Sequence, residues 1–226
     1  MSILKQKRFW KQATVHQRDD GYGVMLDARS VNTPNKTPLI VTTRSMAEAV
    51  AAEWDAQSEK IDPLSMPVTR SANSALDKVL PQQTEVVAML AEYGDSDLLC
   101  YRAAGPVELI AQQVAAWDIM LDWAAEEFGS RLAVGEGVMH VKQDPALIAN
   151  LHAQVAAFDH FALVGVHALV SISGSLILAL AVTRVAIPVA DAGGKRRVDE
   201  HWQTTQWGDD NVSSANDLWK DHALSH

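Results

Sequence analysis

Cysteine is nearly absent from this chain, and its absence narrows the chemistry that the protein can perform. Cys100 is the only cysteine among 226 residues, so no disulfide can form within the chain, and a reducing compartment is indicated. No metal-ligand spacing includes it. A lone cysteine is more often a small buried hydrophobe than a nucleophile, and we expect Cys100 to lie in the core.

The linear motifs of catalysis and nucleotide binding are also missing. Gly135-Glu136-Gly137 lacks the third glycine of a dinucleotide-binding turn, and no phosphate-binding loop occurs. His160 and His167 share a helical face, but no acidic ligand lies four residues beyond either. We therefore predict no catalytic residue, no metal and no cofactor. The alternative is an enzyme of unknown class with an active-site cleft between domains, in which one of these histidines titrates.

No charged residue occurs from Phe161 to Thr183, a stretch long enough to raise the question of a membrane span. His167 lies inside it, and Ser173-Gly174-Ser175 places hydroxyl groups and a glycine near its middle. The flanks carry neither aromatic belts nor a basic cluster. We predict two buried helices of a globular core and no stable membrane insertion.

The net charge of −9 is unevenly distributed along the chain. The first 18 residues contain five lysines and arginines and no acid, so the rest of the chain is more acidic than the total. This pattern argues against a nucleic-acid partner. Because no apolar segment follows the basic residues, we expect no secretory signal and a cytosolic or matrix-like location.

The first third of the chain has the pattern of a small sheet with a covering helix. Asp20-Gly21 is typical of a tight hairpin turn, so residues 9–16 and 24–27 are predicted to pair as strands. Ser45 and Glu48 have the spacing of a capping box at the start of a helix. We expect Met46, Val50 and Trp54 to face the core of this helix, and its acidic residues Glu48, Glu53 and Asp55 to face water.

The remaining two thirds are predicted to be helical. Pro81 separates the expected helices 67–80 and 82–91, since proline disrupts a helix interior. A longer helix is predicted to begin after Gly105-Pro106 and to end at Gly129. Its predicted core stripe consists of Val107, Ile110, Val114, Trp117, Leu121, Ala124 and Phe128. The fold class is therefore α+β, with a β-rich domain at residues 1–78 and a mainly helical domain at 79–226.

The C-terminal segment from Val198 to His226 combines acidic residues with tryptophans. Trp202, Trp207 and Trp219 alternate with aspartates and one glutamate. Indoles among carboxylates are consistent with plain helix packing, and aromatic anchors with a charged rim are equally a feature of protein interfaces. Composition leaves both interpretations open.

Several short segments, in their order and spacing, resemble a known family of F-type ATPase assembly chaperones that act on the α subunit. In mitochondria this family is known as ATP synthase mitochondrial F1 complex assembly factor 2, and it also occurs in alphaproteobacteria. The segments are Lys7-Arg8-Phe9-Trp10-Lys11, Leu26-Asp27-Ala28-Arg29, Val31-Asn32-Thr33-Pro34, Ala52-Glu53-Trp54-Asp55-Ala56-Gln57, Asn73-Ser74-Ala75-Leu76-Asp77, Asp97-Leu98-Leu99-Cys100-Tyr101-Arg102, Trp117-Asp118, Trp123, Asp199-Glu200-His201-Trp202-Gln203 and Trp207-Gly208.

The resemblance implies an ATP-independent protein that is not an enzyme and that holds the free α subunit of the F1 sector until it pairs with β. It also implies a monomer, located in the cytoplasm of a bacterium and in the mitochondrial matrix for eukaryotic relatives. By its spacing to Trp207-Gly208, the functionally important acid of the family falls on Asp199. The implied partner-binding residues are Asp199, Glu200, Trp202, Trp207 and Trp54.

Two alternatives accompany that site. Asp199 is also suited to be a plain carboxylate at a helix N-terminus, where the macrodipole favours negative charge. Trp54 is interpreted first as a core residue and second as a contact. Gly193-Gly194 depart from the family pattern, and because glycine disfavours helix interiors we expect the helix to start only at Lys195.

Overall fold

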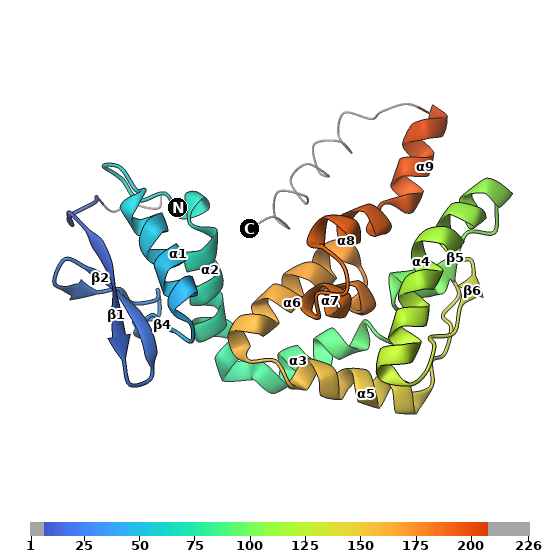
Figure 1. Ribbon diagram of the computed structural model, residues 1–226, viewed down its shortest axis with the longest axis horizontal. Helices are drawn as coiled ribbons and strands as arrows, with labels where there is room; N and C mark the ends of the chain where they lie inside the picture. The colour runs from blue at the N-terminus through green and yellow to red at the C-terminus, as the bar shows by residue number, and fades with distance from the viewer. Residues whose placement is uncertain (1–6, 208–226) are drawn as a thin grey trace. The chain divides into compact units, whose positions relative to one another are not determined.

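The computed structural model describes residues 7–207, and the chain divides into two compact units between Gln83 and Thr84 (Figure 1). A four-stranded sheet and its helices make up the first unit, and helices dominate the second, so the predicted α+β class is confirmed. No helix among the described residues is both long and apolar enough to span a membrane.

The strands and helices have the following bounds. The strands are β1 Ala13–Arg18, β2 Gly21–Leu26, β3 Arg29–Ser30, β4 Ile40–Val41, β5 Tyr101–Arg102 and β6 Gly135–Glu136. The helices are α1 Arg44–Asp55, α2 Pro67–Ser74, α3 Gln83–Glu92, α4 Val107–Phe128, α5 Pro145–Ala156, α6 His160–Ser173, α7 Leu176–Thr183, α8 Val189–Arg196 and α9 Val198–Trp207.

In the first unit, β2 is the central strand of the sheet. It pairs antiparallel with β1 over its whole length, while β3 and β4 pair with its other edge. The hairpin predicted at Asp20-Gly21 is present, and Gly21 has a positive φ of 141°. α1 packs on β1 and β2, and Ala47 and Val50 of the helix are buried, as is Val24 of β2. The sheet and its covering helix thus form one small core.

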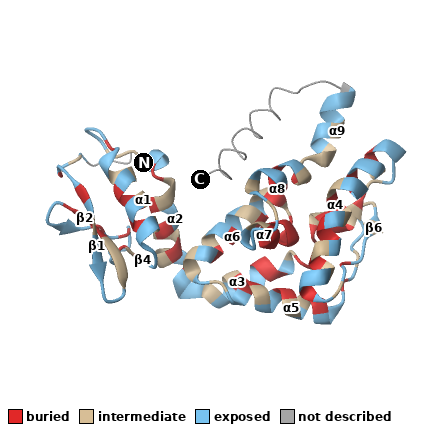
Figure 2. Cartoon of the chain, in the orientation of Figure 1, coloured by how far each residue is buried: buried red, intermediate tan, exposed pale blue. Residues whose placement is uncertain are grey.

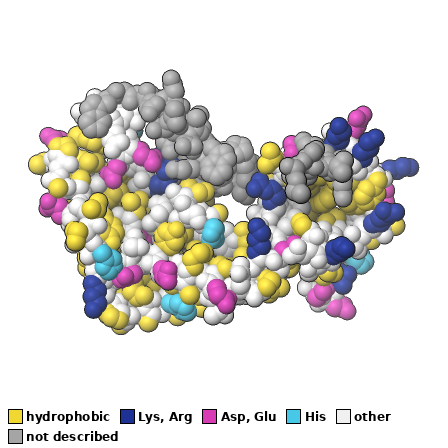
Figure 3. Space-filling view, turned by 180° about the vertical axis from the view of Figure 1, so that it is seen from behind, with side chains coloured by type: hydrophobic (Ala, Val, Ile, Leu, Met, Phe, Trp, Pro, Cys, Tyr) yellow, Lys and Arg dark blue, Asp and Glu magenta, His cyan; other side chains and the backbone are white. Residues whose placement is uncertain are grey.

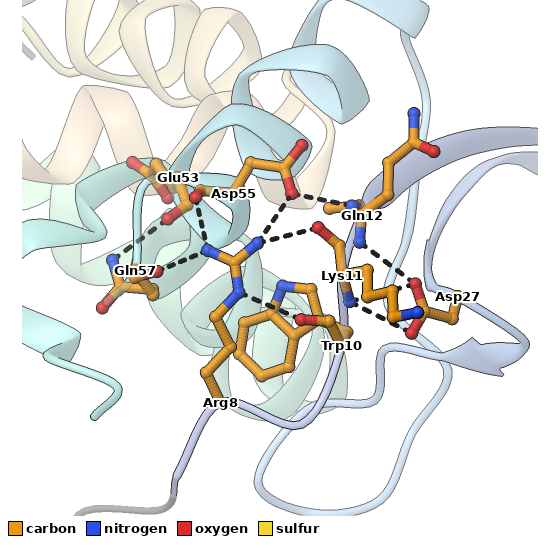
Figure 4. Close-up of polar contacts among 9 residues, drawn as sticks. Arg8, Trp10, Lys11, Gln12, Asp27, Glu53, Asp55 and Gln57 are labelled. Atoms are coloured by element: carbon orange, nitrogen blue, oxygen red, sulfur yellow. Dashed lines mark hydrogen bonds and ion pairs between the residues drawn. The ribbon is translucent and has the colours of Figure 1, made fainter. Parts of the chain in front are cut away.

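The first strand begins at Ala13, four residues later than predicted, because the side chain of Arg8 holds residues 8–11 outside the sheet. The Arg8 guanidinium donates to the backbone oxygens of Trp10 and Lys11 on its own segment (Figure 4). It also donates to the oxygens of Asp55 and Gln57 at the end of α1, where the macrodipole favours a cation. This arrangement ties the chain to the helix instead of extending β1.

Two expectations about α1 are wrong. The N-cap is Thr43, whose hydroxyl accepts from Met46 N at 3.3 Å, and Ser45 lies in the first turn instead. Glu53 does not face water, because its carboxylate accepts from the backbone nitrogens of Val68 and Thr69 at 2.7 and 2.8 Å. Asp55 is exposed as predicted, and its carboxylate also accepts from Ala13 N at 2.8 Å. Both acids connect α1 to neighbouring elements.

Pro81 does not divide two helices as predicted. The chain stays helical from α2 to α3, passing through a π-helical turn at Ala75–Val79 and a 3-10 turn at Leu80–Gln82. Pro81 has no backbone N–H to donate. The change of helix type lets the helical hydrogen bonding continue past it without a break.

In the second unit, the core is built around α7, which contacts α4, α6 and α8. Figure 2 shows it almost entirely in the colour of buried residues, in agreement with its exposed fractions of 0–1% from Leu176 to Ala181. The predicted break is confirmed: α6 ends at Gly174 with φ +70°, and Ser175 caps α7 by accepting from Leu178 N at 3.0 Å. The uncharged stretch is therefore two helices of the core, but only α7 is buried throughout, whereas α6 buries one face and exposes the other, including His167.

Two other helix predictions need correction. The first half of α4 buries Leu109 and Gln113, whereas Val107 and Val114 are 77% and 43% exposed. Gly193 and Gly194 lie inside α8, which ends before a separate helix α9 begins. Gly193 is buried and Gly194 is exposed.

Candidate partner-binding site

Three of the five residues implied as partner contacts lie on the first half of α9. Asp199 and Glu200 are in its first turn and Trp202 follows one turn further on. A carboxylate in this position interacts favourably with the helix macrodipole. Because α9 packs on α4 and α8, its first turn is anchored and its other side faces water.

A buried amide positions Asp199. Gln113 in α4 is 2% exposed, and its Nε2 donates to Asp199 Oδ1 at 2.6 Å. Its Oε1 accepts from Ala103 N at 2.8 Å. Both ends of the buried amide are therefore satisfied, as burial requires. The carboxylate of Asp199 is held in one orientation while it remains half-exposed.

A second pair of hydrogen bonds fixes the helix that precedes α9. Trp117 in α4 is fully buried, and its Nε1 donates to Lys195 O at 2.7 Å. In return, Lys195 Nζ donates to Ala116 O at 3.0 Å. These reciprocal bonds join the end of α8 to the middle of α4, so the start of α9 is set by the fold.

Glu200 and Trp202 complete an acidic and aromatic surface on α9. The Glu200 carboxylate is exposed and lies 3.3 Å from Arg196 Nη1, one turn earlier. Trp202 is half-buried. Arg196 is buried, so the pair compensates its charge while the Glu200 carboxylate also faces water.

Further charges lie along α4 beside this surface. Asp118 accepts from Arg102 Nη2 at 2.6 Å and lies 3.3 Å from Arg131 Nη2. The Arg102 guanidinium is 5.0 Å from the centre of the Trp117 ring, within the range of a cation–π contact. Burial lowers the pKa of Arg102, and the charge of Asp118 opposes that effect. The network stiffens the end of β5 against α4.

Trp54 and Trp207 are not brought into this cluster. Trp54 belongs to α1 in the other unit, half-buried in edge-to-face contact with Trp10 at 5.2 Å between ring centres. Its position agrees with the interpretation as a packing residue. Trp207 is the last residue of α9, and its side chain lies outside the described residues, as does the whole of Trp219.

Sequence reasoning missed the residue that organises the site. Gln113 occupies the buried face of α4 together with Leu109, Trp117 and Met120. A polar side chain in such a stripe must find buried partners. That requirement was the available signal, although the sequence does not say which residue is the partner.

The residues considered as candidates for catalysis or metal binding, Cys100, His160 and His167, differ in their burial and contacts. Cys100 is buried as predicted, and burial raises the pKa of its thiol to about 12, so it stays protonated at neutral pH. His160 lies against Phe161 at 4.4 Å between ring centres, while His167 is exposed. Within residues 7–207, no group of three or more histidines, cysteines and acids is placed to hold a metal ion.

Solved structures of other proteins are similar to this one over nearly its whole length. The structure is similar to Atp12 from Paracoccus denitrificans, with a TM-score of 0.94 and 44% identity, covering 96% of this chain and 94% of that one. It is equally similar to a mutant of Paracoccus denitrificans Atp12p, with coverage of 96% and 93%. The Atu1473 protein of Agrobacterium tumefaciens matches with a TM-score of 0.89 and 36% identity, at 96% and 83% coverage.

These likenesses place the protein among the chaperones. The family model described as ATP12 chaperone protein matches residues 7–125, more than half of the sequence. The chain belongs to the ATP12 chaperone family.

Proposed function

We propose that this protein is an ATP-independent assembly chaperone that binds the free α subunit of the F1 sector of F-type ATP synthase. The observation that supports the proposal most directly is the fixed carboxylate of Asp199, held by buried Gln113 on a surface that also carries Glu200 and Trp202. Membership of a chaperone family supports the same function.

A free subunit of an obligate complex needs such a partner. Its interface with the next subunit is large and apolar, and until assembly it is exposed to self-association. A chaperone that covers this interface and is displaced by the true partner requires no nucleotide. Release then follows from the larger area that the two subunits bury together.

The acidic residues of α9 have a specific part in this proposal. Charged groups at an interface set the register and accelerate encounter more than they add to affinity. Asp199 is fixed before binding, so little further ordering is needed when it meets a cation on the α subunit. Trp202 supplies aromatic contact one turn further along α9, and Trp207 and Trp54 are further proposed contacts. The protein acts as a monomer in the bacterial cytoplasm.

The deciding experiment is capture of purified F1 α subunit by this protein carrying Asp199→Lys. We expect the charge reversal to abolish capture while the far-ultraviolet circular dichroism and the melting temperature stay close to those of the unchanged protein. Asp191→Lys is the matched control, because Asp191 is an exposed aspartate in the first turn of neighbouring α8. Undiminished capture by the Asp199 variant would remove this residue from the site.

A second variant separates contact from helix capping. Asp199→Asn keeps a side-chain oxygen that accepts from Gln113 but removes the charge. Loss of capture with unchanged stability is expected if the charge meets the partner. Equal capture by the asparagine variant assigns Asp199 a structural role only.

A further inference from the structure

A loop in the second unit exposes two neighbouring apolar side chains. We define the tip loop as residues 133–143, which connect the segment after α4 to the start of α5. Val138 is 94% exposed and Met139 is 78% exposed. Isolated exposed hydrophobic residues are ordinary on protein surfaces, but two in succession at the end of a closed loop form a protruding apolar tip.

The base of the tip loop is closed by one buried side chain. Gln143 is 4% exposed, and its Oε1 accepts from Ala133 N at 2.8 Å. Its Nε2 donates to Ala133 O at 3.1 Å and to Val141 O at 3.2 Å. The two ends of the loop are therefore clipped together, as in compact surface loops that often have a function.

Two further contacts hold the loop above its base. β6 within the loop pairs in parallel with β5, and Gly137 N donates to Arg102 O at 2.8 Å. Gly137 has a φ of +78°, which favours glycine, and it directly precedes the apolar pair. On the other side, His140 Nε2 lies 2.9 Å from Asp95 Oδ2. The residues on both sides of Val138 and Met139 are thus fixed.

This construction does not bury the two apolar side chains in the protein itself. A loop that served only as a connection would gain free energy by turning them inward. Fixing the loop before binding lowers the entropy lost when a partner covers the tip. The arrangement is that of a preformed contact element.

We propose that the tip loop is a second contact for the chaperone's client, inserting Val138 and Met139 into an apolar depression on the F1 α subunit. This inference rests on the function proposed above. Continuity with α9 supports it: Arg102 accepts from Gly137 of the loop, and the next residue, Ala103, donates to Gln113, which holds Asp199. One hydrogen-bonded framework therefore carries both contacts.

Charge favours a protein partner over an anionic membrane surface. Residues 84–207 contain fifteen aspartates and glutamates against seven lysines and arginines. In the view of Figure 3, the dark-blue cationic side chains gather mainly over the first unit. An anionic bilayer repels so acidic a unit, whereas an apolar depression on a protein accepts Val138 and Met139 without a positive surround.

The test is the affinity for purified F1 α subunit of a variant carrying Val138→Ser and Met139→Ser. We expect the Kd to rise roughly ten- to hundred-fold, from the lost burial of two apolar side chains. Val185→Ser is the matched control, since Val185 is 88% exposed in the same unit, and its affinity should be unchanged. Equal melting temperatures establish that the loop variant is folded.

Oxidation of the unchanged protein gives a measurement that needs no variant. Peroxide converts exposed methionine to its sulfoxide, and mass spectrometry gives the rate at each position. In complex with the α subunit, Met139 should be protected severalfold, while Met89, 41% exposed in α3, serves as the internal reference.

Each other outcome overturns the proposal in a recognisable way. If the unchanged protein and the loop variant bind the α subunit equally, the loop is not a contact and the proposed function stands. If the unchanged protein does not bind the α subunit, the proposed function fails and the loop inference fails with it. Loop-dependent binding to vesicles of anionic lipid, or a dimer of the chain lost in the variant, would replace the client by a membrane or a second copy.

Discussion

Gln113 and Asp199 are 86 residues apart in the sequence, and the side-chain amide of the first donates to the carboxylate of the second at 2.6 Å. Because Gln113 is buried and also accepts from Ala103 N, it cannot turn to another partner without leaving a polar group unsatisfied. The acid of α9 is consequently held in place by the core of the second unit.

The first prediction concerns this bond. Gln113→Leu keeps the volume of the side chain but leaves Ala103 N without its acceptor and Asp199 without its donor. We expect the free energy of unfolding to fall by about 1–3 kcal/mol. Urea denaturation measures the loss, and capture of the α subunit should weaken because the first turn of α9 is no longer fixed.

The same substitution tests whether stability and capture are linked. Gln112→Leu is the control, because Gln112 is the neighbouring exposed residue of α4. An unchanged free energy of unfolding in Gln113→Leu would show that the buried amide is not needed to hold α9.

The second prediction concerns Glu53, which caps a helix other than its own. Its carboxylate accepts from Val68 N, Thr69 N and the Thr69 hydroxyl at the start of α2. Glu53→Ala leaves these donors without their acceptor and is expected to cost about 1–3 kcal/mol of stability. Glu48→Ala on the same helix removes only an exposed ion pair with Arg44 and should be nearly neutral. Equal losses in the two variants would contradict the capping role.

These residues show which features can be predicted from the sequence. The break between α6 and α7 was predictable, because Gly174 and Ser175 end and start helices through their own local geometry. The roles of Glu53 and Gln113 were not, since each depends on a partner in another helix. Stripe spacing along α4 also failed to distinguish Leu109 and Gln113 from Val107 and Val114, which lie on adjoining faces.

The site was predictable to a similar extent. Resemblance located Asp199, Glu200 and Trp202, and the structure places all three on one helix. What anchors that helix, the Trp117 bond to Lys195 O, is tertiary and has no linear motif. The domain boundary expected after residue 78 stays a prediction, because compact units do not by themselves show which segments fold independently.

The third prediction is a pH dependence of stability caused by Asp97. This carboxylate is fully buried and accepts from Leu99 N and Ile177 N, both at 3.0 Å. Burial raises its pKa to about 6, although the backbone donors oppose the rise. Between the ordinary aspartate pKa and about 6, the folded state therefore binds more protons than the unfolded state. This contribution to stability is present at low pH and is lost as the pH rises toward 6.

Asp97→Asn isolates that contribution. The variant is expected to be less stable than the unchanged protein, since the amide cannot accept at both positions. The difference between the two free energies of unfolding should be larger at pH 4 than at pH 7, by on the order of 2 kcal/mol. Urea titrations at several pH values measure it. A difference that does not vary with pH would assign Asp97 an ordinary pKa.

The last prediction concerns Val185, which ends α7 in the left-handed conformation with a φ of 58°. Val185 N donates to Val182 O at 3.0 Å and Ala186 N donates to Ala181 O at 2.9 Å, the pattern of a Schellman motif. Glycine is the usual residue at this position, and a β-branched side chain is strained there. Because Val185 is 88% exposed, its replacement loses little burial.

Val185→Gly should raise the free energy of unfolding by about 1 kcal/mol, after allowance for the greater freedom of glycine in the unfolded chain. Val185→Ala retains a Cβ and should gain less, so a glycine variant no more stable than the alanine variant would show that the helix end carries no such strain.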